Sequence, residues 1–173
     1  MSMYPEHFIA PMREELTRLG VEELRTADEV DARLRDAKGT TLVVVNSMCG
    51  CAARNARPAI ARALQNAQVP DHLTTVFAGQ DAEATQAARR WFTGYPPSSP
   101  SIGLLREGKL VFFLERHQIE GRTADEIAGD LTRAFATRRA PRSSSSTRCA
   151  AVPRATPGRR SRARCRTRRC PIT

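Results

Sequence analysis

The chain has 173 residues, with 28 Lys and Arg against 18 Asp and Glu, and a formal net charge of +10. Residues 138–173 hold 12 Arg and no acidic residue, which leaves 16 basic and 18 acidic residues in 1–137. One core needs about 100–150 residues, so we expect one domain at 1–137 and a basic tail at 138–173. No apolar run approaches the roughly 20 residues that span a bilayer, which predicts a soluble, cytoplasmic protein with no membrane partner.

Two helices are predicted before the first long strand. Apolar residues recur on one helical face over residues 8–19, and Gly20 follows as a stop. A capping box at residues 26–29 (TADE) starts a second helix, which Gly39 ends. The short apolar stretch at residues 21–24 leaves open whether a strand lies between the two helices.

Two units of strand followed by helix come next. Residues 40–45 (TTLVVV) form a continuous β-branched and apolar run, which is typical of a strand covered on both faces. The Ala-rich residues 52–68 predict a helix with a kink at Pro58. Residues 73–77 predict a second strand, and residues 81–91 predict a helix.

The chain closes with a hairpin and a helix. A loop at residues 93–100 leads into two apolar runs, 101–105 and 110–114, separated by a Glu-Gly turn. A second capping box at residues 123–126 starts the last helix. This order predicts an α/β fold with a central mixed sheet flanked by helices on both faces.

The Cys49-Gly50-Cys51 motif lies where the first long strand ends and a helix begins. Unpaired amides and the positive end of the helix dipole stabilise a thiolate at such a place. A disulfide across one intervening residue needs a bent backbone, which Gly50 permits, and it is strained and easily exchanged. The motif therefore predicts thiol–disulfide chemistry.

Other interpretations of this region remain open. Arg54 and Arg57 either add positive potential at the thiols or form an ordinary solvated helix face. The two cysteines are otherwise buried apolar thiols or half of a metal site. Zinc needs about four ligands, and the three histidines do not have matching spacing, so we expect no metal. Those histidines are His7, His72 and His117.

Several further motifs occur in the order found in a known family. They are Met3-Tyr4-Pro5, residues 46–53 (NSMCGCAA), Arg57-Pro58, residues 97–101 (PSSPS) and residues 115–122 (ERHQIEGR). Together with the strand, CxC motif and helix, they resemble the bacilliredoxin family and its thioredoxin-like fold over about residues 3–136.

The resemblance implies a thiol–disulfide oxidoreductase that removes bacillithiol, or a similar low-molecular-weight thiol, from mixed disulfides of cytosolic proteins. It also implies disulfide isomerase or reductase activity, with no cofactor beyond the thiol co-substrate. Cys49 is then the attacking thiol and Cys51 the resolving thiol. Gly50, Ser99 and Pro100 are implied to bind substrate. Pro100 matches a proline that takes a cis peptide bond facing the redox motif, although an ordinary trans loop proline is the alternative.

The chain also departs from thioredoxins. Thioredoxins have two residues between their cysteines and a buried carboxylate six positions before the first, whereas this chain has one residue and Val43. We therefore do not expect fast general protein reduction. Trp91, Phe92 and Tyr95 either line a thiol-binding groove or, in the case of the first two, pack in the core.

The tail has the composition of a disordered segment, because Arg, Ser, Pro, Ala and Thr bury too little apolar surface to offset ordering. Its 12 positive charges make non-specific nucleic-acid binding an alternative function. All of these charges are Arg, and the resemblance stops before them, which is typical of an out-of-frame or unselected extension. We assign the tail no function, and truncation at Thr137 separates the two alternatives.

Overall fold

The computed structural model describes residues 4–137. The tail predicted at 138–173, including its predicted disorder, nucleic-acid binding and three cysteines, lies outside the described residues. The described part holds a five-stranded sheet in the order β1-β3-β2-β4-β5. Its strands are β1 (Glu22–Glu23), β2 (Thr40–Asn46), β3 (His72–Phe77), β4 (Ser101–Arg106) and β5 (Lys109–Leu114).

The sheet is mixed, as predicted. β3 pairs in parallel with both β1 and β2, whereas β4 is antiparallel to β2 and to β5. The helical segments are α1 (Glu6–Thr17), α2 (Ala27–Arg35), the π-helix η1 (Ala52–Ala56), α3 (Arg57–Ala63), α4 (Ala82–Arg89), α5 (Arg116–Ile119) and α6 (Ala124–Ala136). Strand and helix alternate up to α4 and a hairpin follows, which is the thioredoxin-like arrangement that the resemblance predicts.

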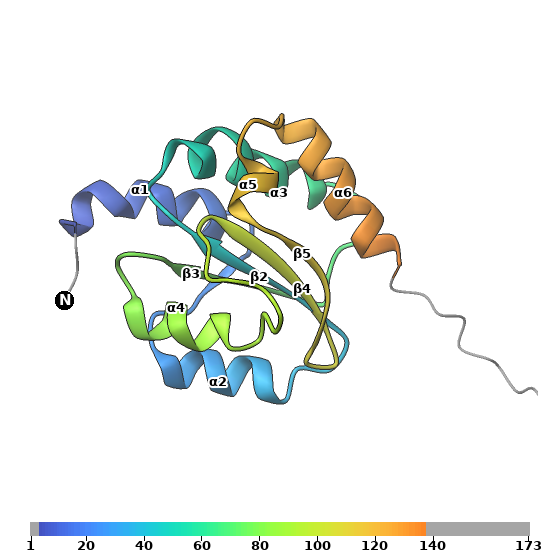
Figure 1. Ribbon diagram of the computed structural model, residues 1–173, viewed down its shortest axis with the longest axis horizontal. Coiled ribbons are helices and arrows are strands. Elements are labelled where there is room, and N and C mark those ends of the chain that lie inside the picture. The colour runs from blue at the N-terminus through green and yellow to red at the C-terminus, as the bar shows by residue number, and fades with distance from the viewer. Residues whose placement is uncertain (1–3, 138–173) are drawn as a thin grey trace, which may run out of the picture. The chain divides into compact units, whose positions relative to one another are not determined.

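Helices cover both faces of the sheet, and β2 shows why its sequence is apolar throughout. Leu42 and Val44 pack in one core with α1, α3 and α6. Val43 and Val45 pack in the other core with α2 and α4. Figure 1 shows these two helical layers above and below the strands. Because successive side chains of a strand point to opposite faces, a central strand needs apolar residues at every position.

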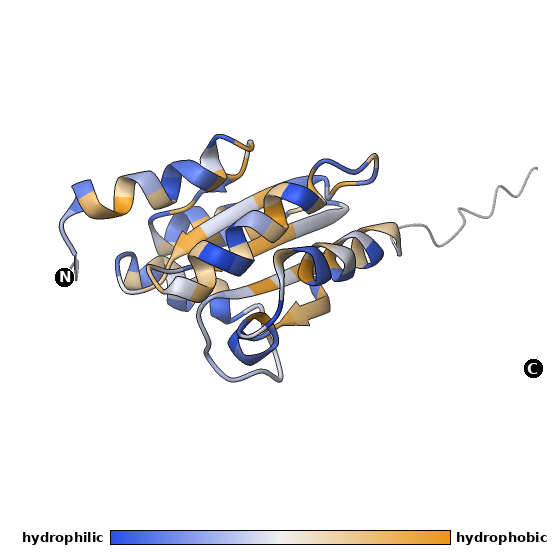
Figure 2. Cartoon of the chain, turned by 90° about the horizontal axis from the view of Figure 1, so that it is seen from above, coloured by the Kyte–Doolittle hydropathy of each residue, from blue (hydrophilic) through white to orange (hydrophobic). Residues whose placement is uncertain are grey.

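Both predicted capping boxes are present and begin α2 and α6. Thr26 accepts a hydrogen bond from the Glu29 N–H, and Thr123 accepts one from the Glu126 N–H. Figure 2 shows that polar and apolar residues alternate around the helices of the chain. None of the helices within residues 4–137 is both long and apolar enough to cross a membrane.

The helix predicted at 52–68 differs from the observed chain. It begins as the π-helical η1, ends at Ala63 and carries Pro58 in the first turn of α3 instead of at a central kink. Proline has no N–H for the α-helical bond to Arg54, and the N–H of Arg57 instead donates to the Ala52 carbonyl. The wider π-turn therefore accommodates the proline directly after the CxC motif.

Aromatic residues after α4 belong to the core on the α2 and α4 side. Phe92 is buried and its ring lies 4.8 Å from that of Phe113, while Tyr95 is 48% exposed. A Cβ at Gly103 would lie 2.4 Å from Phe92, so only glycine fits there. The core-packing interpretation holds for Phe92, and Trp91 packs partly buried against the same core.

Candidate active site

The CxC motif is held by the end of β2 and the start of the following helical segment. The side-chain oxygen of Asn46 accepts the Ser47 N–H at 2.9 Å, which closes the turn after the strand. The Cys49 carbonyl then accepts the N–H groups of Ala52 and Ala53 at 3.1 and 3.2 Å. The motif is thus tied to the backbone on both sides.

The two sulfur atoms lie close together without a positive φ at the central glycine. Cys49 and Cys51 are free, partly exposed thiols whose Sγ atoms are 2.7 Å apart. Gly50 and Cys51 already have helical conformation, so the first turn itself brings the sulfurs together. A Cβ at position 50 would lie 3.3 Å from the flexible Arg54 guanidinium.

The surroundings shift the pKa values of the two thiols in opposite directions. Burial disfavours the Cys49 thiolate, but hydrogen bonds from the Cys51 thiol, the Ser47 hydroxyl (3.2 Å) and the Ala52 N–H (3.4 Å) outweigh it and lower the pKa of Cys49. Burial raises the pKa of Cys51, and the bond to Cys49 and the charge of the Cys49 thiolate raise it further. These shifts favour the thiolate at Cys49 and the protonated thiol at Cys51.

The cations near the motif are not arranged as the sequence suggests. Arg54 is exposed and does not contribute to the lowered pKa of Cys49. Arg57 is 3% exposed, so the solvated-face interpretation is wrong for it. The charge that favours a thiolate at Cys51 comes instead from Arg116 at the start of α5.

Arg57 holds the residues that lead from β2 to Cys49, residues 46–49, which we call the redox loop. Its Nη1 donates to the Asn46 side-chain oxygen at 3.3 Å and to the Ser47 carbonyl at 3.2 Å, and its Nε donates to Glu15 at 2.7 Å. One guanidinium thus joins α1, the end of β2 and α3. It positions the loop that carries Cys49 without touching the sulfur.

The proline loop lies next to the motif. The Ser99–Pro100 peptide bond is cis, as the resemblance implies, and Pro100 is buried. It leads into β4, whose first residue, Ser101, pairs with Val45 near the end of β2. The chain that follows Pro100 therefore runs beside the strand that delivers the cysteines.

A cavity of about 400 Å³ opens beside Cys49. It brings the cysteine loop together with one face of α4, the proline loop and α5. The described residues that line it are Tyr4, Ser47, Met48, Cys49, Ala78, Gly79, Ala82, Thr85, Gln86, Arg89, Ser99 and Arg116. Ser99, which the resemblance implies binds substrate, lines this cavity together with Cys49, whereas Gly50, Pro100 and the aromatic residues 91, 92 and 95 do not.

Four lining residues have roles that sequence reasoning missed: Ser47, Thr85, Arg89 and Arg116. Ser47 and Arg116 lie inside the family-like stretches 46–53 and 115–122, so their position was signalled but not their chemistry. Thr85 and Arg89 carry no sequence signal, because only the packing of α4 beside β3 brings them to the cysteines. Within residues 4–137, no three His, Cys, Asp or Glu side chains gather as a metal site would need.

Comparison with known proteins agrees with this geometry. The protein-family model described as "Disulphide isomerase" matches residues 4–138. A bacilliredoxin of Koribacter versatilis is 62% identical over 133 residues, covering 77% of this chain and 92% of the relative. The chain belongs to the bacilliredoxin family. A bacilliredoxin of Salinibacter ruber is 57% identical over 134 residues, 76% of this chain and 79% of its own.

Family membership fixes the general chemistry of this bacilliredoxin-family chain. It is a thiol–disulfide oxidoreductase with a thioredoxin-like fold. Among solved structures, a thioredoxin of Fasciola hepatica is similar over 69% of this chain and 100% of its own, with 20% identity and a TM-score of 0.48.

Removing the Ser47 hydroxyl tests its stabilisation of the thiolate. Ser47→Ala is expected to raise the pKa of Cys49, because a hydrogen bond to a charged group contributes about 1.5–3 kcal/mol. The thiolate exists only above that pKa, so the alkylation rate falls as the pH drops through it. On this rising limb the rate in the variant should be about ten-fold below the native rate.

Alkylation by iodoacetamide against pH, quantified on the Cys49 peptide, measures the effect. Ser98→Ala is the matched control, since within the described part of the chain the Ser98 hydroxyl has no hydrogen-bond partner. An unchanged profile in Ser47→Ala would show that this hydroxyl does not stabilise the thiolate.

Proposed function

We propose that the chain removes bacillithiol, or a similar low-molecular-weight thiol, from mixed disulfides on cytosolic proteins. The observation that carries the proposal is the pairing of a Cys49 thiol of lowered pKa with a Cys51 thiol of raised pKa, 2.7 Å apart beside an open cavity. A cavity of this size suits a small molecule better than a folded segment. The names of the relatives point to the same chemistry.

The first step transfers the small thiol to the enzyme. The Cys49 thiolate attacks the sulfur of the small thiol, the S–S bond of the mixed disulfide breaks, and the client leaves as a thiolate that takes up a proton. The small thiol is now bonded to Cys49. The client sulfur has been reduced from the disulfide to the thiol level, the Cys49 sulfur has been oxidised from the thiol to the disulfide level, and the sulfur of the small thiol stays at the disulfide level.

Two routes complete the turnover. In one, Cys51 loses its proton and attacks the Cys49 sulfur, which releases the small thiol and leaves a Cys49–Cys51 disulfide for a second thiol or dithiol to reduce. In the other, a free small thiol attacks the sulfur bound to Cys49, giving a small-molecule disulfide and free Cys49. The same exchange steps on a client disulfide amount to isomerase or reductase activity.

The residues implied to bind substrate have separate parts in this proposal. Ser99, directly before the cis bond to Pro100, lies in the cavity wall beside Cys49 and would contact an incoming disulfide there. Gly50 lines a second cavity, on the Cys51 side, where it leaves Cys51 free of a neighbouring side chain. The client is recognised through its exposed mixed disulfide, and no bound cofactor takes part.

Mass spectrometry of the intact chain tests the proposal. The chain, with Cys149, Cys165 and Cys170 replaced by serine, is incubated with a carrier protein that bears bacillithiol on its one cysteine. The expected product is free carrier and a chain bearing bacillithiol on Cys49, which then clears as the Cys49–Cys51 disulfide forms. A carrier that keeps its bacillithiol, or a covalent adduct between carrier and Cys49 alone, would contradict this direction of attack.

A further inference from the structure

The cavity beside Cys49 is positively charged and lacks acidic residues. Its lining includes the guanidinium groups of Arg89 and Arg116, and no Asp or Glu is among the described residues of the wall. A second cavity, on the Cys51 side, is lined by Glu120 and Asp125 as well as arginines. The wall next to the attacking sulfur thus carries positive charge without carboxylates, whereas the second cavity has two carboxylates beside its three arginines.

Arg89 is the cation of this wall that has no carboxylate partner in residues 4–137. Arg116 pairs with Glu120 at 3.4 Å, whereas Arg89 donates a hydrogen bond to the Ser98 carbonyl at 3.3 Å. Arg89 is half-buried, its Nε is buried without a partner, and burial lowers its pKa. A partly desolvated guanidinium gains most from a bidentate anion.

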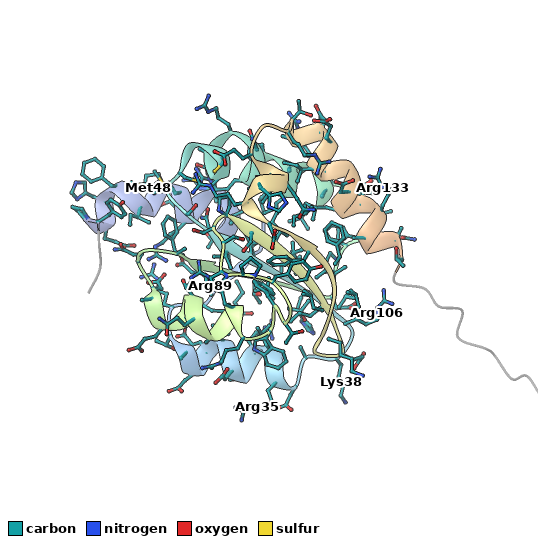
Figure 3. All side chains as sticks on the ribbon, viewed as in Figure 1. Arg35, Lys38, Met48, Arg89, Arg106 and Arg133 are labelled. Atoms are coloured by element: carbon teal, nitrogen blue, oxygen red, sulfur yellow. The ribbon has the colours of Figure 1, made fainter. Side chains whose placement is uncertain are left out.

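The helix α4 aims this side chain along the cavity. Ala82, Thr85, Gln86 and Arg89 follow one another at helical spacing, and all four line the wall. Arg89 and Met48, which both line the cavity, are labelled in Figure 3.

A buried hydroxyl lies on the same face. Thr85 is 3% exposed, and its Oγ1 has no hydrogen-bond partner in the described part of the protein. Buried polar groups are rarely left unpaired. A carboxylate can accept hydrogen bonds from both this hydroxyl and the arginine one turn later.

We infer that the Arg89–Thr85 face of α4 is a subsite that binds a carboxylate of the small thiol while its sulfur reacts with Cys49. The inference rests on the proposed function and deepens it, because it names the class of thiol: low-molecular-weight thiols that carry a carboxylate. Arg89 and Thr85 bind and orient this substrate. Neither takes part in the exchange of sulfur bonds.

Two probes that differ in one charge test the subsite. They are mixed disulfides of 2-thiopyridine with N-acetylcysteine, which carries a carboxylate, and with N-acetylcysteine amide, which does not. Attack by Cys49 on the cysteine sulfur breaks the S–S bond and releases 2-thiopyridone, which is followed by absorbance. The full chain with its three tail cysteines changed to serine gives one turnover per molecule.

The native site should load the carboxylate probe at least about five times faster than the amide probe at subsaturating concentration. Arg89→Gln should bring this ratio close to one, and Thr85→Val should reduce it about two- to three-fold. Arg90→Gln is the matched control, since Arg90 is the next residue but pairs with Asp31 away from the cavity. The ratio is unaffected by any change in the acidity of Cys49, because both probes meet the same thiolate.

The remaining outcomes of the two-probe experiment overturn either the subsite or the proposed function. Equal loading of both probes by the native chain would overturn the subsite and leave the proposed function standing. A native preference that Arg89→Gln retains, or that Arg90→Gln loses equally, would also overturn it. Loading of neither probe on Cys49 would overturn the proposed function itself.

Discussion

Cys49→Ala should abolish transfer of a small thiol from a mixed disulfide, whereas Cys51→Ala should keep a substantial part of it. Within residues 4–137 the other cysteine is Cys51, whose pKa is raised by burial and by its hydrogen bond to Cys49. It is therefore a poor nucleophile at neutral pH. We expect the loss in Cys49→Ala to exceed about a thousand-fold, as for removal of an attacking thiolate.

Cys51→Ala should instead accumulate the loaded form. Without Cys51, the small thiol stays bonded to Cys49 until a second free thiol displaces it. Peptide mass spectrometry after a short incubation should find the adduct on Cys49 in Cys51→Ala and little of it in the native chain. If Cys51→Ala were as inactive as Cys49→Ala, the route through a second free thiol would be wrong and resolution by Cys51 obligatory.

Arg57→Met should destabilise the fold by about 3 kcal/mol and disturb the redox loop. The substitution leaves the Ser47 carbonyl and the Asn46 side-chain oxygen without their guanidinium donor in a buried place. It also removes the ion pair that ties α3 to α1 through Glu15. Urea unfolding measures the loss in free energy, and alkylation against pH reports on the Cys49 thiolate.

Two further variants make the Arg57 experiment specific. Arg54→Met removes an exposed arginine one turn earlier and should change the free energy of unfolding by less than about 0.5 kcal/mol. Arg57→Lys keeps the charge but not the forked geometry and should recover only part of the loss. Arg57→Met with native stability and a native alkylation profile would show that the buried guanidinium does not position the loop.

Local sequence signals predicted most of the fold. The capping boxes at Thr26 and Thr123 and the apolar run of β2 depend on neighbours within a few residues, so sequence alone reveals them. The four-residue α5 was missed because it is too short to show a periodic pattern. The helix after the CxC motif was predicted too long because its Ala-rich sequence contains no residue that signals where the helix ends. The π-turn depends on how Pro58 interrupts one particular hydrogen bond.

The candidate site was predicted in part for the same reason. Cys49, Cys51 and Ser99 belong to short motifs, and the structure places Cys49 and Ser99 in one cavity wall. Arg57 was interpreted through its helix alone, whereas its partner Glu15 is 42 residues away. The place of Arg89 and Thr85 beside Cys49 follows from the packing of α4, which no local pattern encodes.

In the proposed mechanism, the opposite pKa shifts of the two thiols set the order in which they react. Burial, the hydrogen bond to Cys49 and the charge of its thiolate together keep Cys51 protonated. Once Cys49 carries a small thiol, that negative charge is gone, while burial and the positive charge of Arg116 still act on Cys51. The second thiol therefore becomes easier to ionise only after the first has reacted, so the empty enzyme presents one nucleophile at a time.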